Sequence, residues 1–207
     1  MISWMKEEQV STLRKQSEAI MPTDWGKFNM ISYSTHHADR MPHFALLKEN
    51  TLTHAPVLVR IHSECLTGDL FSSHRCECGE QLKRSMELIS KEGGVLIYLR
   101  QEGRGIGIIN KLHAYQKQDE GYDTVAANHV LGFESDARSY EAAIRILSDL
   151  GLYQIKLLTN NPLKVEAFND SPIRIVERVP LLIKPKEENL DYLKTKQDLM
   201  GHYLDLS

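Results

Sequence analysis

Three cysteines within one short stretch are the residues of this sequence whose types and spacing most clearly suggest chemistry. Cys65, Cys76 and Cys78 are the 3 cysteines of the chain, in a C-x10-C-x-C arrangement. An odd number of thiols argues against a closed disulfide framework. Zinc favours thiolate ligands, and three protein ligands leave the fourth tetrahedral position to water, as in catalytic sites. The pattern therefore favours a metal centre that acts as a Lewis acid and activates water.

The same residues allow two other interpretations. A closed structural zinc site could take its fourth ligand from His62 or His74. The three cysteines could also be ordinary buried residues with no metal. Spacing alone does not decide between these possibilities, because C-x10-C-x-C is not a common zinc-finger spacing.

A glycine-rich segment, RQEGRGIG at residues 100–107, offers a second kind of chemistry. Its three glycines would let the backbone approach a polyanion closely, while Arg100 and Arg104 supply positive charge. The alternative is a glycine-rich turn with solvated arginines. The segment matches neither a Walker A motif nor a Rossmann fingerprint.

Several ordered motifs resemble the signature segments of the GTP cyclohydrolase II family: RIHSECLTGD, RCECG, RQEGRGIG, DTVAANHVLGF and LLTNNPLKV. The resemblance runs from about Met21 to near the C-terminus, and several motifs in consistent order are far more specific than one short pattern. It implies hydrolysis of GTP to formate, pyrophosphate and 2,5-diamino-6-hydroxy-4-(5-phosphoribosylamino)pyrimidine, the first step of riboflavin biosynthesis.

The resemblance also implies which residues bind metal and nucleotide. Cys65, Cys76 and Cys78 would hold one Zn2+, and Mg2+ is expected on the triphosphate. Glu64 or Glu102 could accept hydrogen bonds from guanine, whereas Arg104 and Lys164 suit phosphates. The implied nucleotide-binding residues are Arg60, Ile61, His62, Ser63, Glu64, Gln81, Glu102, Gly103, Arg104, Thr124, Thr159 and Lys164.

Three further residues are implied to be catalytic. Arg138 would be the nucleophile at the α-phosphate, with Asp136 as proton acceptor, although a guanidinium that stays protonated could instead clamp the phosphate electrostatically. The two residues stand at the start of a predicted helix, where Asp136 could simply be a cap and an arginine opposes the helix dipole. Tyr115 is a candidate donor to charge developing on the guanine ring, or a packing residue.

The elements that must position these residues follow from hydrophobic periodicity. Strand patterns at residues 25–33, 43–49 and 55–62 suggest an antiparallel sheet, and residues 128–133 resemble a loop. Helical spacing predicts helices over 79–91, 106–119 and 139–150, and the polar segment 187–204 is a further helix candidate. Asn161 and Pro162 form an N-cap and N1 pair that opens the helix of Lys164. Strands are predicted at 95–99, 155–158 and 173–179.

These patterns predict a mixed α/β single domain, with a strand-rich, largely antiparallel first half and helices alternating with strands in the second half. A doubly wound nucleotide-binding fold is a poorer match. Residues 1–20 are expected to be an N-terminal extension whose residues 6–20 form a surface helix or a mobile arm, and residues 21–207 the catalytic domain.

Composition restricts the partners. The 207 residues are 42% hydrophobic, which is enough to form a buried core in a soluble protein. The net charge of −3 gives no broad basic surface for nucleic acid or membranes. Reduced cysteines and no signal-like N-terminus favour the cytoplasm. The resemblance further implies a homodimer. A length of 207 residues leaves no room for the dihydroxybutanone-phosphate synthase domain to which family members are sometimes fused, so a stand-alone enzyme is expected. The alternatives are a paralogue that stops at the formamide or at GMP, and a non-catalytic, zinc-stabilised nucleotide-binding module.

Overall fold

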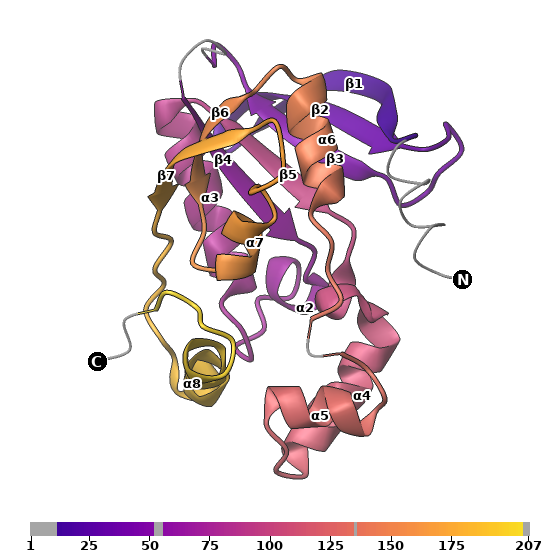
Figure 1. The fold of residues 1–207 in the computed structure, drawn as a ribbon, viewed down its shortest axis with the longest axis vertical. Coiled ribbons are helices and arrows are strands. Elements are labelled where there is room, and N and C mark those ends of the chain that lie inside the picture. Colours follow the sequence, from indigo (N-terminus) through magenta and orange to yellow (C-terminus); the bar gives the residue numbers. More distant parts are fainter. Residues whose placement is uncertain (1–11, 52–55, 135, 205–207) are drawn as a thin grey trace.

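A single seven-stranded sheet forms the centre of the molecule (Figure 1). The structure, a computed structural model, describes residues 12–51, 56–134 and 136–204. The strand order is β1-β2-β3-β5-β4-β6-β7. The strands are β1 (Arg14–Thr23), β2 (Gly26–Ser34), β3 (His43–Lys48), β4 (Val57–Ser63), β5 (Val95–Leu99), β6 (Gln154–Leu158) and β7 (Arg174–Val179).

The sheet changes character at β5. Strands β1, β2, β3 and β5 pair antiparallel, whereas β5, β4, β6 and β7 pair parallel. The predicted mixed α/β domain is therefore confirmed. The expected antiparallel pairing of the first three strand segments holds for β2 with β3 but is wrong for β4, which lies between β5 and β6. The reason is the helical crossover between β4 and β5, because such a connection returns the chain parallel to the strand it left.

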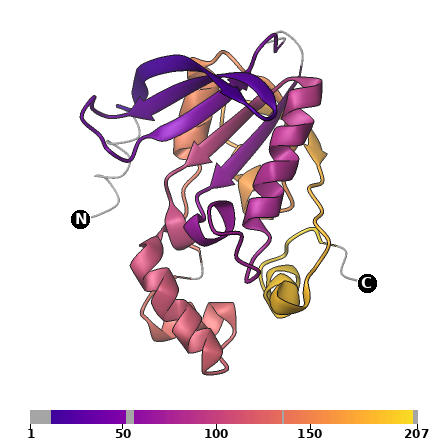
Figure 2. The ribbon, with the colours of Figure 1, turned by 180° about the vertical axis from the view of Figure 1, so that it is seen from behind.

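Helices cover both faces of the sheet, α6 on the face toward the viewer in Figure 1 and α3 on the face toward the viewer in Figure 2. The helices are α2 (Leu66–Asp69), α3 (Cys78–Glu92), α4 (Gly107–Asp119), α5 (Thr124–Val130), α6 (Glu141–Asp149), α7 (Pro162–Glu166) and α8 (Leu190–Asp198). Two 3-10 turns, η1 (Glu102–Gly105) and η2 (Glu187–Asn189), precede α4 and α8.

Two hydrophobic clusters fill the space between the sheet and its helices. Alternate side chains of the central strands point to opposite faces, so Val59 and Ile97 pack on the α6 side while Leu58 and Leu96 pack on the α3 side. Parallel strands with both faces covered are expected to have near-continuous apolar sequences, as VLIYL of β5 has. The central strands are therefore a rigid support for whatever lies at their ends.

The predicted surface helix at residues 6–20 is wrong over its described part. Residues 14–20 belong to β1, which pairs antiparallel with β2, while residues 6–11 lie outside the described residues. The weak apolar stripe that favoured a helix is overridden by backbone hydrogen bonding to β2, since local propensity yields to tertiary pairing. Strand β1 also crosses residue 20, the predicted edge of the catalytic domain; the domain limits stay a prediction.

Two further segments differ from expectation. Residues 128–130, predicted as part of a loop, belong to α5, which Asp123 caps by accepting hydrogen bonds from Val125 N and Ala126 N. The predicted C-terminal helix ends at Asp198, and Gly201 then adopts a positive φ of 63° that turns the chain. Among the helices of the described ranges, none is long and apolar enough to cross a membrane.

A core substitution on the central strand tests this arrangement. Ile97 is fully buried, so Ile97→Ala should lower the unfolding free energy by about 2–5 kcal/mol through lost burial and a residual cavity. Urea unfolding should show a lower midpoint at an unchanged slope. Ile20→Ala, at a side chain that is 59% exposed on β1, is the control and should stay within about 0.5 kcal/mol. Equal shifts for the two variants would contradict the assignment of the core.

Candidate active site

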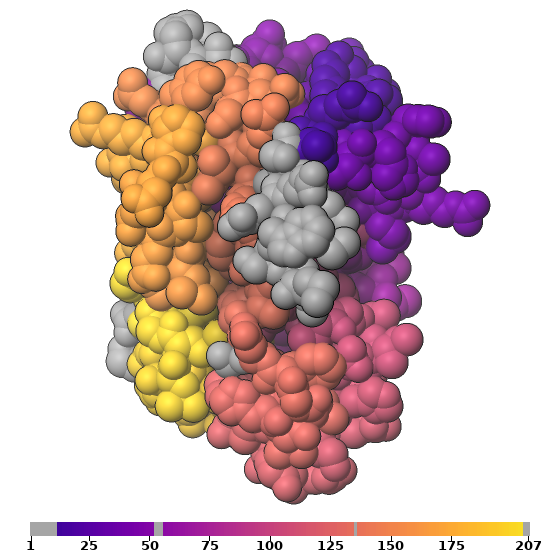
Figure 3. Space-filling view, turned by 45° about the vertical axis from the view of Figure 1, so that its right-hand side comes forward, coloured from indigo at the N-terminus to yellow at the C-terminus, as the bar shows by residue number. Residues whose placement is uncertain are grey.

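A cavity opens where the parallel strands β4 and β5 end. In sheets of this kind ligands bind beyond the carboxyl ends of the strands. The cavity together with its open mouth encloses about 860 Å³. The α4–α5 segment and the C-terminal segment with α8 lie side by side at this end of the molecule (Figure 3). Both contribute side chains to the cavity, together with β4, α3 and η1.

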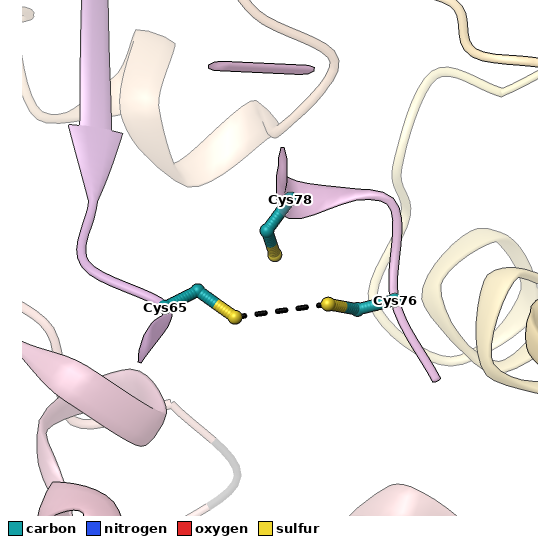
Figure 4. Close-up of side chains that lie close together, drawn as sticks. All are labelled: Cys65, Cys76 and Cys78. Atoms are coloured by element: carbon teal, nitrogen blue, oxygen red, sulfur yellow. Dashed lines mark hydrogen bonds between the residues drawn. The ribbon is translucent and has the colours of Figure 1, made fainter. Parts of the chain in front are cut away.

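The three cysteines line this cavity, and their side chains point toward one another (Figure 4). Their sulfur atoms all lie within 4.8 Å of one another, and the Cys65 and Cys76 sulfurs are 3.6 Å apart. Two thiolates on one tetrahedral zinc, with Zn–S bonds of about 2.3 Å, stand about 3.8 Å apart. The thiols are thus placed to bind one metal ion without a change of backbone.

Two glycines allow the segments that carry these cysteines to approach each other. A Cβ atom on Gly68 would lie 2.9 Å from Cys76 Sγ and 3.2 Å from Cys65 Sγ. A Cβ atom on Gly79 would lie 2.2 Å from the Gly68 carbonyl oxygen, far inside van der Waals contact. Helix α2, which follows Cys65, can therefore touch the start of α3, which carries Cys78, only because both positions lack a side chain.

Neither candidate for a fourth protein ligand, His62 or His74, belongs to the cluster of cysteine sulfurs. His62 Nε2 contacts Asp69 Oδ1 at 2.9 Å, and its ring stacks on Tyr98 with ring centroids 5.6 Å apart. His74 Nδ1 contacts Glu188 Oε1 at 3.1 Å on the surface. Within the described ranges, Cys65, Cys76 and Cys78 are the only cluster of potential ligands. The geometry favours a three-thiolate site over the closed alternative.

The three thiols of the cluster cannot all ionise easily without a bound cation. Hydrogen bonds from Cys76 and Cys78, with the nearby Lys111 ammonium, lower the pKa of the Cys65 thiol. Lys111 Nζ donates to Cys65 Sγ at 3.1 Å and to Glu102 Oε1 at 2.8 Å. Hydrogen bonding to the Cys65 thiolate, together with burial, raises the pKa of Cys76 and Cys78. A divalent cation would remove this conflict, because it stabilises all three thiolates together.

Buried positive charge also gathers in this cavity. Arg60 donates to the Leu158 carbonyl and to Gln81 Oε1, both at 3.0 Å, and burial lowers its pKa to about 10. Lys164 Nζ donates to the Ile61 carbonyl at 2.7 Å, and burial with repulsion from Arg60 and Arg138 places its pKa well below the usual range. An anionic ligand would relieve both penalties, so the cavity suits a polyphosphate.

Asp136 and Arg138 form a bidentate ion pair. Arg138 Nε donates to Asp136 Oδ1 at 2.8 Å, and the guanidinium NH2 group donates to Oδ2. Burial would lower the pKa of Arg138, but the hydrogen bond and charge of Asp136 outweigh it and raise that pKa. Helix α6 begins later, at Glu141, with Tyr140 as N-cap. The interpretation of Asp136 as its cap, and of Arg138 as a residue of its first turn, is therefore wrong.

Tyr115 lies on α4 and lines the cavity near the thiols. The Arg75 guanidinium carbon is 4.9 Å from its ring centroid and Lys111 Nζ is 5.8 Å away. Burial raises the pKa of its hydroxyl to about 12, so the phenol stays protonated and can donate a hydrogen bond.

Most of the predicted site residues do come together around the cavity. Three do not line it: Ile61 is in the core, Thr159 is buried with its hydroxyl accepting from Asn161 N at 3.0 Å, and Asp136 reaches the site only through Arg138. The predicted residues that line the cavity are Arg60, His62, Ser63, Glu64, Cys65, Cys76, Cys78, Gln81, Glu102, Gly103, Arg104, Tyr115, Thr124, Arg138 and Lys164.

Several residues that line the cavity were not predicted from the sequence. Lys111 precedes Tyr115 by one helical turn on α4, so the two share a face, and helix periodicity could have indicated it. Tyr192 and Lys196 are related in the same way on α8, but nothing in the sequence places α8 near the cysteines. The remaining unpredicted lining residues are Ile106, Ala114, Gln118 and Asn128.

The fold and the site define an α/β protein with a cluster of three thiols that could hold a metal ion in a cation-rich cavity. The model of the family described as GTP cyclohydrolase II matches residues 14–180. The chain therefore belongs to the GTP cyclohydrolase II family.

Curated relatives agree with this assignment. The riboflavin biosynthesis protein RibBA of Bacillus cereus is 53% identical over 193 residues, covering 93% of this chain and 48% of the relative. The RibBA proteins of Bacillus cytotoxicus and Bacillus mycoides are each 52% identical with the same coverage. The chain thus spans about half the length of the curated relatives it matches.

One solved structure is also similar. It is RibBX, a two domain 3,4-dihydroxy-2-butanone 4-phosphate synthase from A. baumannii, with a TM-score of 0.49 and 21% identity. The similarity covers 83% of this chain and 41% of that chain.

The close approach at Gly68 gives a direct test of the metal cluster. Gly68→Ala should lower zinc affinity on the order of ten- to hundredfold, because the new methyl group displaces the Cys76 and Cys65 sulfurs. Zinc content after dialysis against a chelator measures the effect. Leu70→Ala, in the same turn at a side chain that is 67% exposed, should retain zinc like the wild type. An unchanged zinc affinity in a folded Gly68→Ala protein would contradict the proposed cluster.

Proposed function

We propose that this chain is a zinc-dependent GTP cyclohydrolase II that hydrolyses GTP to formate, pyrophosphate and 2,5-diamino-6-hydroxy-4-(5-phosphoribosylamino)pyrimidine, the first step of riboflavin biosynthesis. The observation that carries the proposal is that the thiol cluster and the buried cations open on one cavity. The reaction needs both, since it opens a guanine ring at one end of the substrate and cleaves a phosphate bond at the other. Membership of the family supports the same conclusion.

At the ring-opening end, the chain supplies ligands and hydrogen-bond donors. A zinc ion held by the three thiolates would act as a Lewis acid and activate water for attack at guanine C8 and hydrolysis of the formamide. Three thiolates make such a centre electron-rich, and the Lys111 ammonium 3.1 Å from Cys65 Sγ offsets part of that charge. Tyr115, protonated and facing the cavity, is the donor available to charge that develops on the opened ring.

At the phosphate end, we favour Arg138 as an electrostatic clamp. A nucleophilic arginine must lose a proton, yet Asp136 raises the pKa of Arg138 and so stabilises the protonated form. In the clamp, Asp136 fixes the plane of the guanidinium through two hydrogen bonds, and Arg138 stabilises charge on the α-phosphate as water attacks and pyrophosphate leaves. Arg60 and Lys164 line the same cavity and would bind the remaining phosphate oxygens.

Other parts of the proposal rest on the sequence and the family resemblance rather than on the geometry of the site. They are Mg2+ on the triphosphate, a homodimer, a cytoplasmic location, and action without a fused dihydroxybutanone-phosphate synthase domain. Neither nucleic acid nor a membrane is expected as a partner. Assaying the 207-residue chain by itself with GTP tests whether it acts alone. Accumulated formamide or GMP would identify a paralogue that stops early, and GTP binding without turnover would identify a non-catalytic module.

The two chemistries should separate by mutation, because the metal ligands and Arg138 serve opposite ends of the substrate. Cys76→Ser should abolish formate release while leaving some pyrophosphate release, with GMP as product, because Arg138 and Lys164 remain. Arg138→Ala should lose pyrophosphate release by about 10²-fold or more, as for removal of one preorganised charge donor. Chromatography of the products, with formate and pyrophosphate assayed separately, measures both.

The control for the arginine variant is Arg84→Ala, at an exposed residue of α3 paired with Glu87, which should behave like the wild type. Arg138→Lys distinguishes the two roles of Arg138, since a lysine retains part of an electrostatic clamp but not a guanidinium nucleophile. If folded Cys76→Ser binds GTP but releases neither product, the division of labour is wrong.

Selectivity for guanine is the second test of the function. A partly buried carboxylate that accepts from guanine N1–H and N2–H would be left unpaired by adenine, so GTP should exceed ATP in kcat/KM by about 10⁴-fold. Glu64 and Glu102 both line the cavity, and Glu102 already accepts hydrogen bonds from Leu66 N and Lys111 Nζ. The GTP to ATP ratio in Glu64→Gln and in Glu102→Gln shows which residue reads the base. Comparable turnover of ATP and GTP by the wild type would rule out this recognition.

A further inference from the structure

Helix α8 provides a wall of the cavity from outside the segment that defines the family. The family match ends at residue 180, whereas α8 spans Leu190–Asp198. Within α8, Leu193 is buried, and Tyr192 and Lys196 line the cavity. In Figure 4 the pale yellow helix lies at the right of the view, beyond Cys76. Its position raises the question of what α8 contributes to the site.

The main polar link from α8 to the site is a buried ion pair. Lys196 Nζ donates to Glu77 Oε1 at 2.6 Å, and the two residues are only 8% and 3% exposed. Lys196 Nζ also lies 4.5 Å from the centroid of the Tyr192 ring, which restricts where the ammonium can move. A buried ion pair is held tightly, because removal of one partner leaves an uncompensated charge in a medium of low dielectric.

Glu77 stands between two of the three thiol ligands, Cys76 and Cys78. Its side chain also accepts from Gln81 Nε2 at 3.2 Å, and its backbone carbonyl accepts from Gln81 N at 2.9 Å. Of the residues that the structure describes, Lys196 is the one that forms an ion pair with Glu77, and none donates to Glu77 Oε2. Lys196 is thus the charge partner of a buried carboxylate that otherwise keeps, among the described residues, only the Gln81 amide as donor.

We propose that Lys196 is a positioning residue for the metal site, which ties α8 to the ligand segment 76–78 through Glu77. The inference rests on the proposed function, because it takes the three thiols to be the ligands of a metal ion. Without the ammonium, the Glu77 carboxylate must turn toward water, and Cys76 and Cys78 must move with it. The ammonium also offsets a carboxylate that would otherwise add negative charge next to three thiolates.

Zinc affinity of the full chain tests the role of Lys196 independently of turnover. Lys196→Met, which keeps much of the side-chain volume without the charge, should weaken zinc binding by about 10- to 100-fold in competition with a chelator. Lys196→Arg should restore most of the affinity, since it retains the charge. The matched control is Lys194→Met on the exposed side of α8, where Lys194 pairs with the solvent-exposed Asp191, and it should bind zinc like the wild type.

A double-mutant cycle tests that the effect passes through Glu77. In Glu77→Gln the neutral amide no longer needs a cation, so adding Lys196→Met should cost much less affinity than it does in the wild type. Additive losses would mean that Lys196 acts by another route and would overturn the proposal. Circular dichroism and thermal unfolding of each variant identify any loss that comes from misfolding.

Other outcomes also decide the question. The proposal is wrong if folded Lys196→Met binds zinc as tightly as the wild type, and a raised KM for GTP in that case would assign Lys196 to the phosphates instead. It is equally wrong if the wild type binds no zinc. A wild type that binds zinc, loses it on Lys196→Met and yet turns over no GTP would refute the proposed function while supporting the role of Lys196.

Discussion

The parallel pairing of β4 with β5 is the constraint on which the site depends. Because the two strands run in the same direction, their carboxyl ends meet at one edge, where the chain leaves β4 toward Cys65 and leaves β5 toward η1. Glu102 of η1 can then accept from Leu66 N at 2.5 Å and pair with Lys111, which also donates to Cys65. An antiparallel pairing would send these two loops to opposite ends of the sheet.

Buried charge is the second theme of the structure, and most of it is paired. Arg138 pairs with Asp136, Lys111 with Glu102, and Lys196 with Glu77. Such pairs add little net stability compared with apolar residues, but each fixes the orientation of a side chain at the cavity. Arg60 and Lys164 donate to uncharged oxygens instead, so they retain capacity for an anion. The cavity is thus rigid and still incompletely neutralised, as a site for a polyanionic substrate requires.

Close backbone approach is a third feature, and it links folding to function. Gly68 and Gly79 let α2 touch the start of α3, which brings sulfur atoms from two segments within reach of one ion. The other two thiols favour ionisation of Cys65 by hydrogen bonding, and the resulting thiolate raises the pKa of Cys76 and Cys78, so a bound cation is needed to stabilise three thiolates together. The apolar clusters on both faces of the central strands support this close approach.

The sequence by itself determined the local elements and the chemical types at the site. Apolar runs and helical spacing predicted β5 at 95–99 and α3 near 79–91, and Asn161 with Pro162 predicted the start of α7, where Asn161 accepts from Leu163 N as an N-cap. These features depend on neighbouring residues, which a short window of sequence contains. The motifs likewise indicated the three thiol ligands and most of the side chains that line the cavity.

Only the tertiary structure decided which distant segments meet. In the structure β5 lies between β3 and β4. Residues 14–20, expected to be helical, form a strand that pairs with β2, and Arg138 precedes α6 instead of lying in its first turn. The tertiary structure also brought Lys196 to Glu77, 119 positions away, and Lys111 to Cys65, 46 positions away. Strand order and the pairing of buried charges are settled by competition among long-range contacts, and no local periodicity in the sequence carries that information.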